Sequence, residues 1–474
     1  MATVAYNGTT GVADPGYSAD VPDLNIFYDT GHMTFIAISS LLVLLMIPGV
    51  GFFYSGLARR KSALQLVLLS MLSVAVIGFQ WFFWGYSLTF SRTGNSFLGD
   101  LSQFGLMKTL AQPNGSSAMP DILFCLYQGM FAAITPALAI GAVADRGRML
   151  PAIVFMFIWS TAVYDPIAYW TWNANGWLAK LPSYDFAGGG PVHVSSGACA
   201  LAYSLMLGKR AGYTSNAGLP YRPHSVTNVL LGTVFLWVGW FGFNGGSALS
   251  MNLRAIMACY VTHLAASCAG IAWVLLDYRL ERKWSTIGFC SGAIAGLVAI
   301  TPAAGFVPTW AAVIIGVAGG VCCNFATKLK FLLGVDDALD IFAVHGVGGM
   351  VGNLLTGIFG ASWIADLDGS SHAPIGWIEG NWIQLGYQLA GTCAAFAWSF
   401  GLSCLILFLM NLVPGMSLRV TAEDEDVGID DCQLGEFAYD YVEIKRHFAD
   451  AGVSLSASAS SASSTHEKAP KEVV

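Results

Sequence analysis

Long apolar segments separated by short polar segments run through most of this chain. A helix needs roughly 20 predominantly apolar residues to cross the hydrocarbon core of a bilayer. The segments of about that length and character lie at 33–58, 63–90, 121–143, 150–174, 191–208, 225–249, 255–277, 285–302, 308–327, 342–361 and 383–412. The pattern predicts an all-α integral membrane protein with about eleven transmembrane helices.

Composition agrees with this prediction and excludes several classes of function. Of the 474 residues, 55% are hydrophobic and only 11% are charged, whereas a soluble domain carries roughly 25% charged residues. The net charge of −7 is no guide to partners, because the acids concentrate in the final segment and in loops, and nothing in the sequence indicates nucleic-acid binding. The ten cysteines lack the spacing of a disulfide framework or a zinc site. We therefore expect no metal, no cofactor and no enzymatic activity.

The basic residues predict the orientation of the helices, because they gather in alternate loops. Cytoplasmic loops carry an excess of Lys and Arg, so the N-terminus is predicted outside the cell and the C-terminus in the cytosol. Two N-glycosylation sequons, which begin at Asn7 and Asn114, fall on the predicted outer side. The basic residues in question are Arg59, Arg60, Lys61, Arg146, Arg148, Lys209, Arg210, Arg222, Arg279, Arg282, Lys283, Lys328 and Lys330.

The polar ends of the chain flank the apolar part. Residues 1–31 read as an extracellular N-terminal segment without the basic start and apolar core of a secretory signal. Residues 32–412 form the predicted transmembrane transporter domain, and 413–450 a cytosolic C-terminal region. The serine-rich residues 451–474 are too polar to pack and are predicted to be disordered. A kinase is a possible partner of this tail, because phosphate would change its charge strongly; an inert solvated tail is the alternative.

Ionisable residues inside a membrane span are costly, and those in this chain are therefore functional candidates. His193 lies in the fifth predicted span and His345 in the tenth, and an aspartate precedes each of them. Spans one to five and six to ten would form two halves. Because five is an odd number, the second half would begin on the opposite side of the membrane, and the two halves would be inverted relative to each other. Transporters with inverted repeats place their site where the halves meet. The candidates are Asp165, His193, His263, Asp340 and His345.

A pair of neighbouring imidazoles in an apolar surrounding is most stable when uncharged. Each neutral ring offers one donor and one acceptor, so the pair suits a small hydrogen-bonding substrate or a relayed proton. The alternatives are a purely structural interhelical hydrogen bond, which we favour for the unmatched His263, and ligation of a metal or haem, which usually needs more histidines than this chain supplies.

Aromatic residues form a second group of candidates. Their rings attract a cation by roughly 0.5–2 kcal/mol, and the same spans contain no acid apart from Asp165. Such clusters also serve as ordinary packing. The rings and neighbouring polar residues are Tyr127, Phe131, Trp170, Trp172, Trp240, Phe243 and Ser247.

Four blocks of sequence resemble the signature blocks of the ammonium transporter (Amt/Mep/Rh) family, over residues 24–440. The blocks are Asp185-Phe-Ala-Gly-Gly-Gly-Pro-Val-His193, Gly239-Trp-Phe-Gly-Phe-Asn-Gly-Gly-Ser247, Gly292-Ala-Ile-Ala-Gly-Leu-Val-Ala-Ile-Thr-Pro-Ala-Ala-Gly305 and Asp336-Asp-Ala-Leu-Asp-Ile-Phe-Ala-Val-His-Gly-Val-Gly-Gly349. Two further segments, 164–172 and 435–441, look most like the fungal Mep branch of the family.

The resemblance implies a homotrimer in the plasma membrane that transports ammonium or ammonia, and also methylammonium, through one pore per subunit. It implies an outer cation site at Phe131, Trp172 and Ser247, with Tyr127 beside it and Asp185 behind it. Phe131 and Phe243 would form a gate near which ammonium loses its proton. His193 and His345, with Trp240, would line the hydrophobic pore beyond the gate. A sensor that signals through the tail and a sodium-coupled carrier of another substrate are the alternatives.

Overall fold

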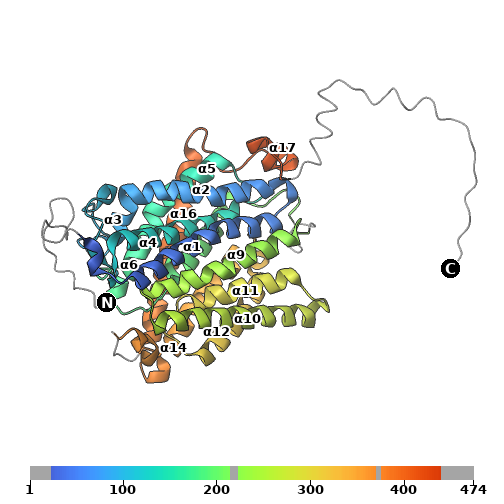
Figure 1. Ribbon diagram of the computed structural model, residues 1–474. Coiled ribbons are helices and arrows are strands. Elements are labelled where there is room, and N and C mark those ends of the chain that lie inside the picture. The colour runs from blue at the N-terminus through green and yellow to red at the C-terminus, as the bar shows by residue number, and fades with distance from the viewer. Residues whose placement is uncertain (1–22, 214–221, 370–374, 439–474) are drawn as a thin grey trace, which may run out of the picture.

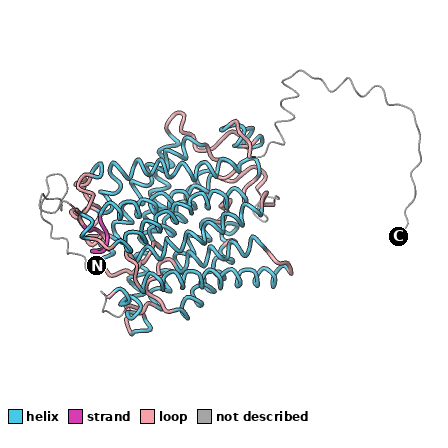
Figure 2. The backbone as a smooth tube through the Cα atoms, in the orientation of Figure 1, coloured by secondary structure: helices cyan, strands magenta, loops and turns pink. Residues whose placement is uncertain are grey.

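The computed structural model describes residues 23–213, 222–369 and 375–438. Within them the chain is helical, apart from the short strand β1 (Pro113–Asn114), which pairs antiparallel with β2 (Ser116–Pro120). The long helices lie side by side in one bundle (Figure 1), and loops connect them at the two ends (Figure 2).

The long helices agree with the predicted spans to within a few residues. Four predicted spans contain or begin with a π-helical segment, a wider turn that is frequent at functional sites. The first half comprises α1 (Thr30–Leu57), α2 (Ala63–Gln80) continued by the π-helix Trp81–Gly85 and α3 (Tyr86–Phe90), α4 (Asp121–Ala139), α5 (Met149–Trp159) continued by the π-helix Ser160–Tyr164 and α6 (Asp165–Trp172), and the π-helix η7 (Gly189–Val194) continued by α8 (Ser195–Leu207).

The remaining long helices form the second half and the C-terminal end of the bundle. They are α9 (Val226–Gly245), α10 (Leu253–Glu281), α11 (Thr286–Ile300), α12 (Thr309–Ala326), the π-helix η9 (Phe342–Val347) continued by α14 (Gly348–Phe359), and α16 (Gln384–Leu412). Short helices fill the connections: α7 (Trp177–Lys180), α13 (Leu329–Leu333), α15 (Ser362–Ala365), α17 (Ala422–Val427) and the π-helix η12 (Asp430–Leu434).

Nine helices in the described part of the chain are long and apolar enough to cross a membrane, and α11 is a shorter apolar helix. The chain is therefore a multi-pass membrane protein. The total of eleven spans and the outward orientation of the N-terminus stay predictions. So does the inverted repeat, although α1 and α9, which would begin the two halves, pack along each other.

Glycines allow these helices to approach closely. A Cβ atom on Gly49 of α1 would lie 3.0 Å from the Cβ of Phe235 and 3.3 Å from the carbonyl oxygen of Gly232, both on α9. At Gly197 of α8 a Cβ would overlap the backbone of Gly346, next to His345. Small residues at such crossings give helices in lipid their van der Waals contact, and here they bring the two halves together at the histidines.

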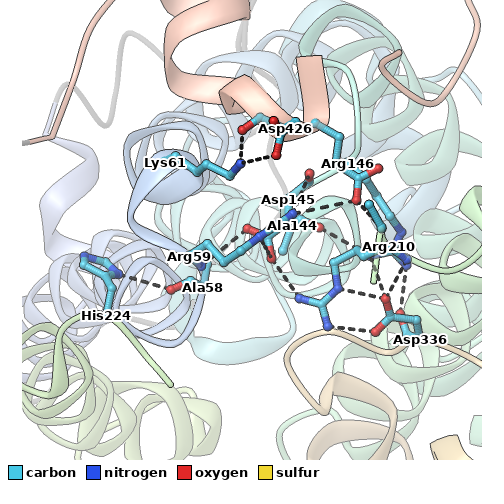
Figure 3. A network of polar contacts seen from close by, with 12 residues as sticks. Ala58, Arg59, Lys61, Ala144, Asp145, Arg146, Arg210, His224, Asp336 and Asp426 are labelled. Atoms are coloured by element: carbon cyan, nitrogen blue, oxygen red, sulfur yellow. Dashed lines mark hydrogen bonds and ion pairs between the residues drawn. The ribbon is translucent and has the colours of Figure 1, made fainter. Parts of the chain in front are cut away.

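Three of the basic loops converge at one end of the bundle, as the alternation of basic loops predicted (Figure 3). The buried carboxylate of Asp145 lies 2.8 Å from Nη1 of Arg210 and 3.3 Å from Nε of Arg59. Arg210 also contacts Asp336, with 2.7 Å between Nη2 and Oδ1. Burial raises the pKa of Asp336, but the hydrogen bonds and charge of Arg210 outweigh it and leave that pKa below its ordinary value.

The C-terminal region is attached to the same end of the bundle. Asp430 accepts hydrogen bonds from the backbone N–H groups of Leu64 (3.0 Å) and Gln65 (2.8 Å) in the first turn of α2. Glu425 accepts from Ala211 N (2.6 Å) and from Nη2 of Arg419 (2.7 Å). The predicted region 413–450 therefore packs on the membrane domain over its described residues, and the predicted tail 451–474 lies outside them.

We predict that Asp430→Ala lowers the stability of the protein by about 1 kcal/mol, the usual cost of losing a helix N-cap. Thermal unfolding of the purified protein in detergent measures this change. Glu423→Ala is the matched control, because Glu423 lies on the exposed side of α17. Equal stability of the Asp430 and Glu423 variants would contradict the capping role.

Candidate functional site

A cavity of about 100 Å³ lies beside the aromatic candidates. Among the residues that line it, Phe131, Trp172 and Ser247 were predicted from the sequence, whereas Gln128 and Phe186 were not. The rings of Phe131 and Trp172 stand nearly perpendicular, at 88°, with their centroids 6.0 Å apart. The cavity thus combines ring faces with the oxygen atoms of a hydroxyl and an amide.

Gln128 adds an acceptor that the sequence reasoning missed. Its side chain is 8% exposed, and Oε1 has no hydrogen-bond partner among the described residues. A buried polar atom without a partner is costly, so this oxygen suits a hydrogen-bonding ligand. The signal in the sequence was its place between Tyr127 and Phe131, one residue from a ring already singled out.

Tyr127 and Asp185 lie behind the cavity and do not line it. The hydroxyl of Tyr127 is within 2.8 Å of the carbonyl oxygen of Phe243 and 3.3 Å from Oγ of Ser247. Asp185 accepts hydrogen bonds from three successive N–H groups, those of Gly188, Gly189 and Gly190, at 2.6–2.8 Å, and Trp172 donates from Nε1 to its carbonyl oxygen at 3.1 Å. Both residues therefore position others.

Phe131 and Phe243 close the inner side of the outer cavity. Their ring centroids are 4.2 Å apart with 32° between the planes, and both side chains are buried. Phe243 is stacked in turn on His193, with centroids 6.0 Å apart. The two rings separate the outer cavity from the histidines, which is the arrangement that a gate requires.

His193 and His345 meet in the centre of the bundle. Their Nδ1 atoms are 3.3 Å apart, within hydrogen-bond distance for one donor and one acceptor. Nε2 of His193 has no partner among the described residues. Trp240 stacks on His193 at 5.4 Å and is held by a hydrogen bond from Nε1 to Thr301 Oγ1 at 2.9 Å.

Each histidine lies in a π-helical segment, and the start of each segment is capped by an aspartate that precedes the histidine by eight residues. Asp185 caps η7, which carries His193. Asp337 accepts a hydrogen bond at Oδ2 from Phe342 N (2.9 Å) at the start of η9, which carries His345. Asp340, the aspartate nearest before His345 in the sequence, does not cap η9: it forms an ion pair with Lys330, with 2.8 Å between Oδ1 and Nζ.

An inner cavity of about 290 Å³ begins at His345. Tyr54, Trp240, Leu339 and Val344 are among its lining residues, and Arg210 and Asp336 lie at its polar part. From the outer cavity inward, the structure therefore places an aromatic and oxygen-lined site, a closed pair of phenylalanines, two histidines and a second cavity. No group of three or more potential metal ligands occurs in the part of the chain that the structure describes.

The other sequence candidates lie away from this line. Asp165 is buried and accepts a hydrogen bond from Nε2 of Gln80 at 2.7 Å. His263 is exposed on α10 beside Trp237. Asn114 donates from Nδ2 to Tyr86, Phe90 and Asp121, and its glycosylation stays a prediction. Asn7 lies outside the described residues.

The acid that caps η9 gives a prediction about pH. Burial raises the pKa of Asp337 to about 6, and Asp340 adds to this effect. Because the folded state binds the proton more tightly than the unfolded chain, this group stabilises the fold most below about pH 4, and that contribution is lost as the pH rises to about 6. Asparagine keeps an acceptor for Phe342 N and has no charge.

We therefore expect Asp337→Asn to gain stability relative to the wild type between about pH 4 and pH 6, by on the order of 2–3 kcal/mol. Thermal unfolding at a series of pH values measures the difference. Parallel pH profiles for the two proteins would show that Asp337 does not titrate in this range.

Comparison with known proteins gives one consistent family. The sequence model of the Ammonium Transporter Family matches residues 34–439. Ammonium transporter 1 of Schizosaccharomyces pombe is 62% identical over 421 residues, 88% of this chain and 84% of its own length. Ammonium transporter MEP2 of Saccharomyces cerevisiae is 51% identical over 441 residues, 92% of this chain and 88% of its own length. The crystal structure of Candida albicans Mep2 superposes with a TM-score of 0.84 at 50% identity, over 88% of this chain and 92% of that one.

Proposed function

The chain belongs to the ammonium transporter family, and on that premise we propose that it carries ammonium or ammonia selectively across the plasma membrane. The observation that carries the proposal is the order of features along the bundle: outer cavity, phenylalanine pair, histidine pair and inner cavity. The residues present suit each step of such a passage.

The outer cavity would recruit the cation. The rings of Phe131 and Trp172 offer their negative faces, and Ser247 and Gln128 offer oxygen acceptors for N–H groups. None of the described residues that line this cavity carries a carboxylate, so the cation would be held weakly and could leave again. A weak site is what conduction requires, because tight binding would block passage.

Beyond the phenylalanine pair the passage favours a neutral molecule. The buried rings of His193, Trp240 and Phe243 stack there, and a bare ion would lose its hydration without receiving an equivalent. Ammonium can give up its proton near the gate and cross as ammonia, with the histidines as hydrogen-bond partners. Potassium can neither donate a hydrogen bond nor lose a proton, and would therefore be excluded.

The finer predictions of the resemblance are part of the same proposal. They are assembly as a homotrimer and transport of methylammonium. The sequence adds glycosylation at Asn7 or Asn114 and modification of the C-terminal tail by a kinase. The comparisons do not favour the alternative of a sensor.

The direct test is the response of proteoliposomes that contain the purified protein to a pulse of ammonium, with potassium as the control. We expect a current or a rise of internal pH for ammonium and neither for potassium. A current would mean that the proton's charge crosses as well, and internal alkalinisation alone would mean that ammonia crosses without it. Equal responses to ammonium and potassium would contradict selective transport.

The histidine pair gives a second prediction. His193→Ala or His345→Ala opens space in the passage and removes its hydrogen-bond partners, so we expect ammonium conduction to fall at least tenfold or the discrimination against potassium to weaken. His263→Ala is the matched control, because that ring faces outward from α10. Wild-type conduction and selectivity in both pore variants would refute the proposed role of the pair.

A further inference from the structure

Arg254, at the start of α10, lies directly behind one wall of the outer cavity. Its Nε donates a hydrogen bond to the carbonyl oxygen of Gly305 at 2.8 Å. Its Nη1 pairs with Oδ2 of Asp368 at 2.5 Å, and the two side chains are only 14% and 16% exposed. Because both partners are largely shielded from water, the charge of either one acts over a longer distance than on an open surface.

The guanidinium packs between two phenylalanine rings. Its Cζ atom is 5.0 Å from the ring centroid of Phe186 and 4.8 Å from that of Phe306, distances at which a cation and a ring attract each other. The rings themselves are edge to face at 5.7 Å. Arg254 therefore fixes the position of both rings.

Phe186 is the ring that connects Arg254 to the site, since it also lines the outer cavity. Its backbone N–H donates to Pro302 O at 3.0 Å. The side chain lies against Gly305, where a Cβ atom would overlap the ring. The wall is thus built from Phe186 in front, the α-carbon of Gly305 at its side, and the guanidinium of Arg254 behind.

Such a wall raises an electrostatic problem for a site that takes a cation. A positive charge one ring away from the cavity would repel a second cation, and the lining residues that the structure describes include no carboxylate to offset it. Asp368 compensates the charge by direct contact. Asp366, on the same turn (Asp366–Asp368), adds a more distant negative charge.

We propose that Arg254 and Asp368 form a positioning pair for the outer cation site: Arg254 holds the Phe186 wall, and Asp368 removes the repulsion that Arg254 would otherwise exert on the incoming cation. This inference rests on the proposed function, because it assigns the pair to the recruitment of ammonium. Neither residue touches the cation; both act through Phe186 and through their charges.

The sign of the charge separates this role from a purely structural one. Asp368→Asn makes the surroundings of the site more positive by one unit, and Arg254→Gln makes them more negative by one unit. The double variant Arg254→Gln/Asp368→Asn restores the wild-type net charge. A structural ion pair would instead make all three variants less stable and leave the apparent KM of each unchanged.

The experiment measures uptake of methylammonium by proteoliposomes against its concentration, at low and at high salt. We expect Asp368→Asn to raise the apparent KM about fourfold at low salt. This is the change in affinity that corresponds to the repulsion between the bound cation and one uncompensated unit charge roughly 10 Å away, at an effective dielectric constant of about 40. Glutamine retains a planar side chain that can pack against Phe186 but carries no charge, so Arg254→Gln should lower the KM or leave it unchanged. The double variant should lie near the wild type, and high salt should reduce the differences.

Two results would overturn the inference: a KM for Asp368→Asn equal to that of the wild type, or a double variant as impaired as Asp368→Asn. Thermal unfolding of each variant shows whether folded protein was measured. Uptake by the wild type separates failure of the Arg254–Asp368 inference from failure of the proposed function. A wild type that takes up neither ammonium nor methylammonium would refute transport itself. Ser247→Ala, which removes an acceptor inside the cavity, is the control for a weakened site without a change of charge.

Discussion

The need to satisfy backbone hydrogen bonds in an apolar surrounding governs how this protein displays its histidines. Backbone polar groups without partners are too costly inside a bilayer, so a helix that begins within the bundle needs a cap. Asp185 supplies one for the segment that carries His193, and Asp337 supplies one for the segment that carries His345. With both segments fixed at their starts, Gly197 and Gly346 allow them to cross closely enough for the imidazoles to meet.

The same cost explains where the charges are. Arg59, Asp145, Arg210 and Asp336 form one connected network at an end of the bundle (Figure 3), and Arg254 with Asp368 forms a pair beside the outer cavity. Between these two places the passage is lined by rings and imidazoles. Under the proposed function, a cation would meet compensated charges at the entrance and no fixed charge among the described residues that line the passage, and selectivity would depend on hydrogen bonding and proton loss.

Hydropathy located the long helices because the bilayer imposes their length and apolar character. The histidines could be found for a related reason: an imidazole in an apolar segment is rare enough to stand out. Phe186 and Gln128 could not be found in this way, because a phenylalanine or a glutamine beside other candidates carries no distinct signal until the fold shows which side chains face the cavity. Trp172, Ser247 and the two phenylalanines were candidates from the sequence itself. The family resemblance supplied the roles predicted for them, because residues from separate helices cannot be grouped from a linear pattern.

The aspartates before His345 show what spacing alone does not decide. Asp336, Asp337 and Asp340 lie within five residues, and all three precede His345. The chain bends there, with Asp340 at a positive φ of 56°, which turns its carboxylate toward Lys330 and leaves Asp337 at the start of η9. Asp336 points the other way, to Arg210. The three acids therefore serve three partners, and the choice among them depends on backbone geometry that a linear pattern cannot express. Asp336 and Asp337 are consecutive, so one peptide bond joins the charge network to the cap of the segment that carries His345. The same network reaches the C-terminal region through the ion pair of Arg59 with Glu425.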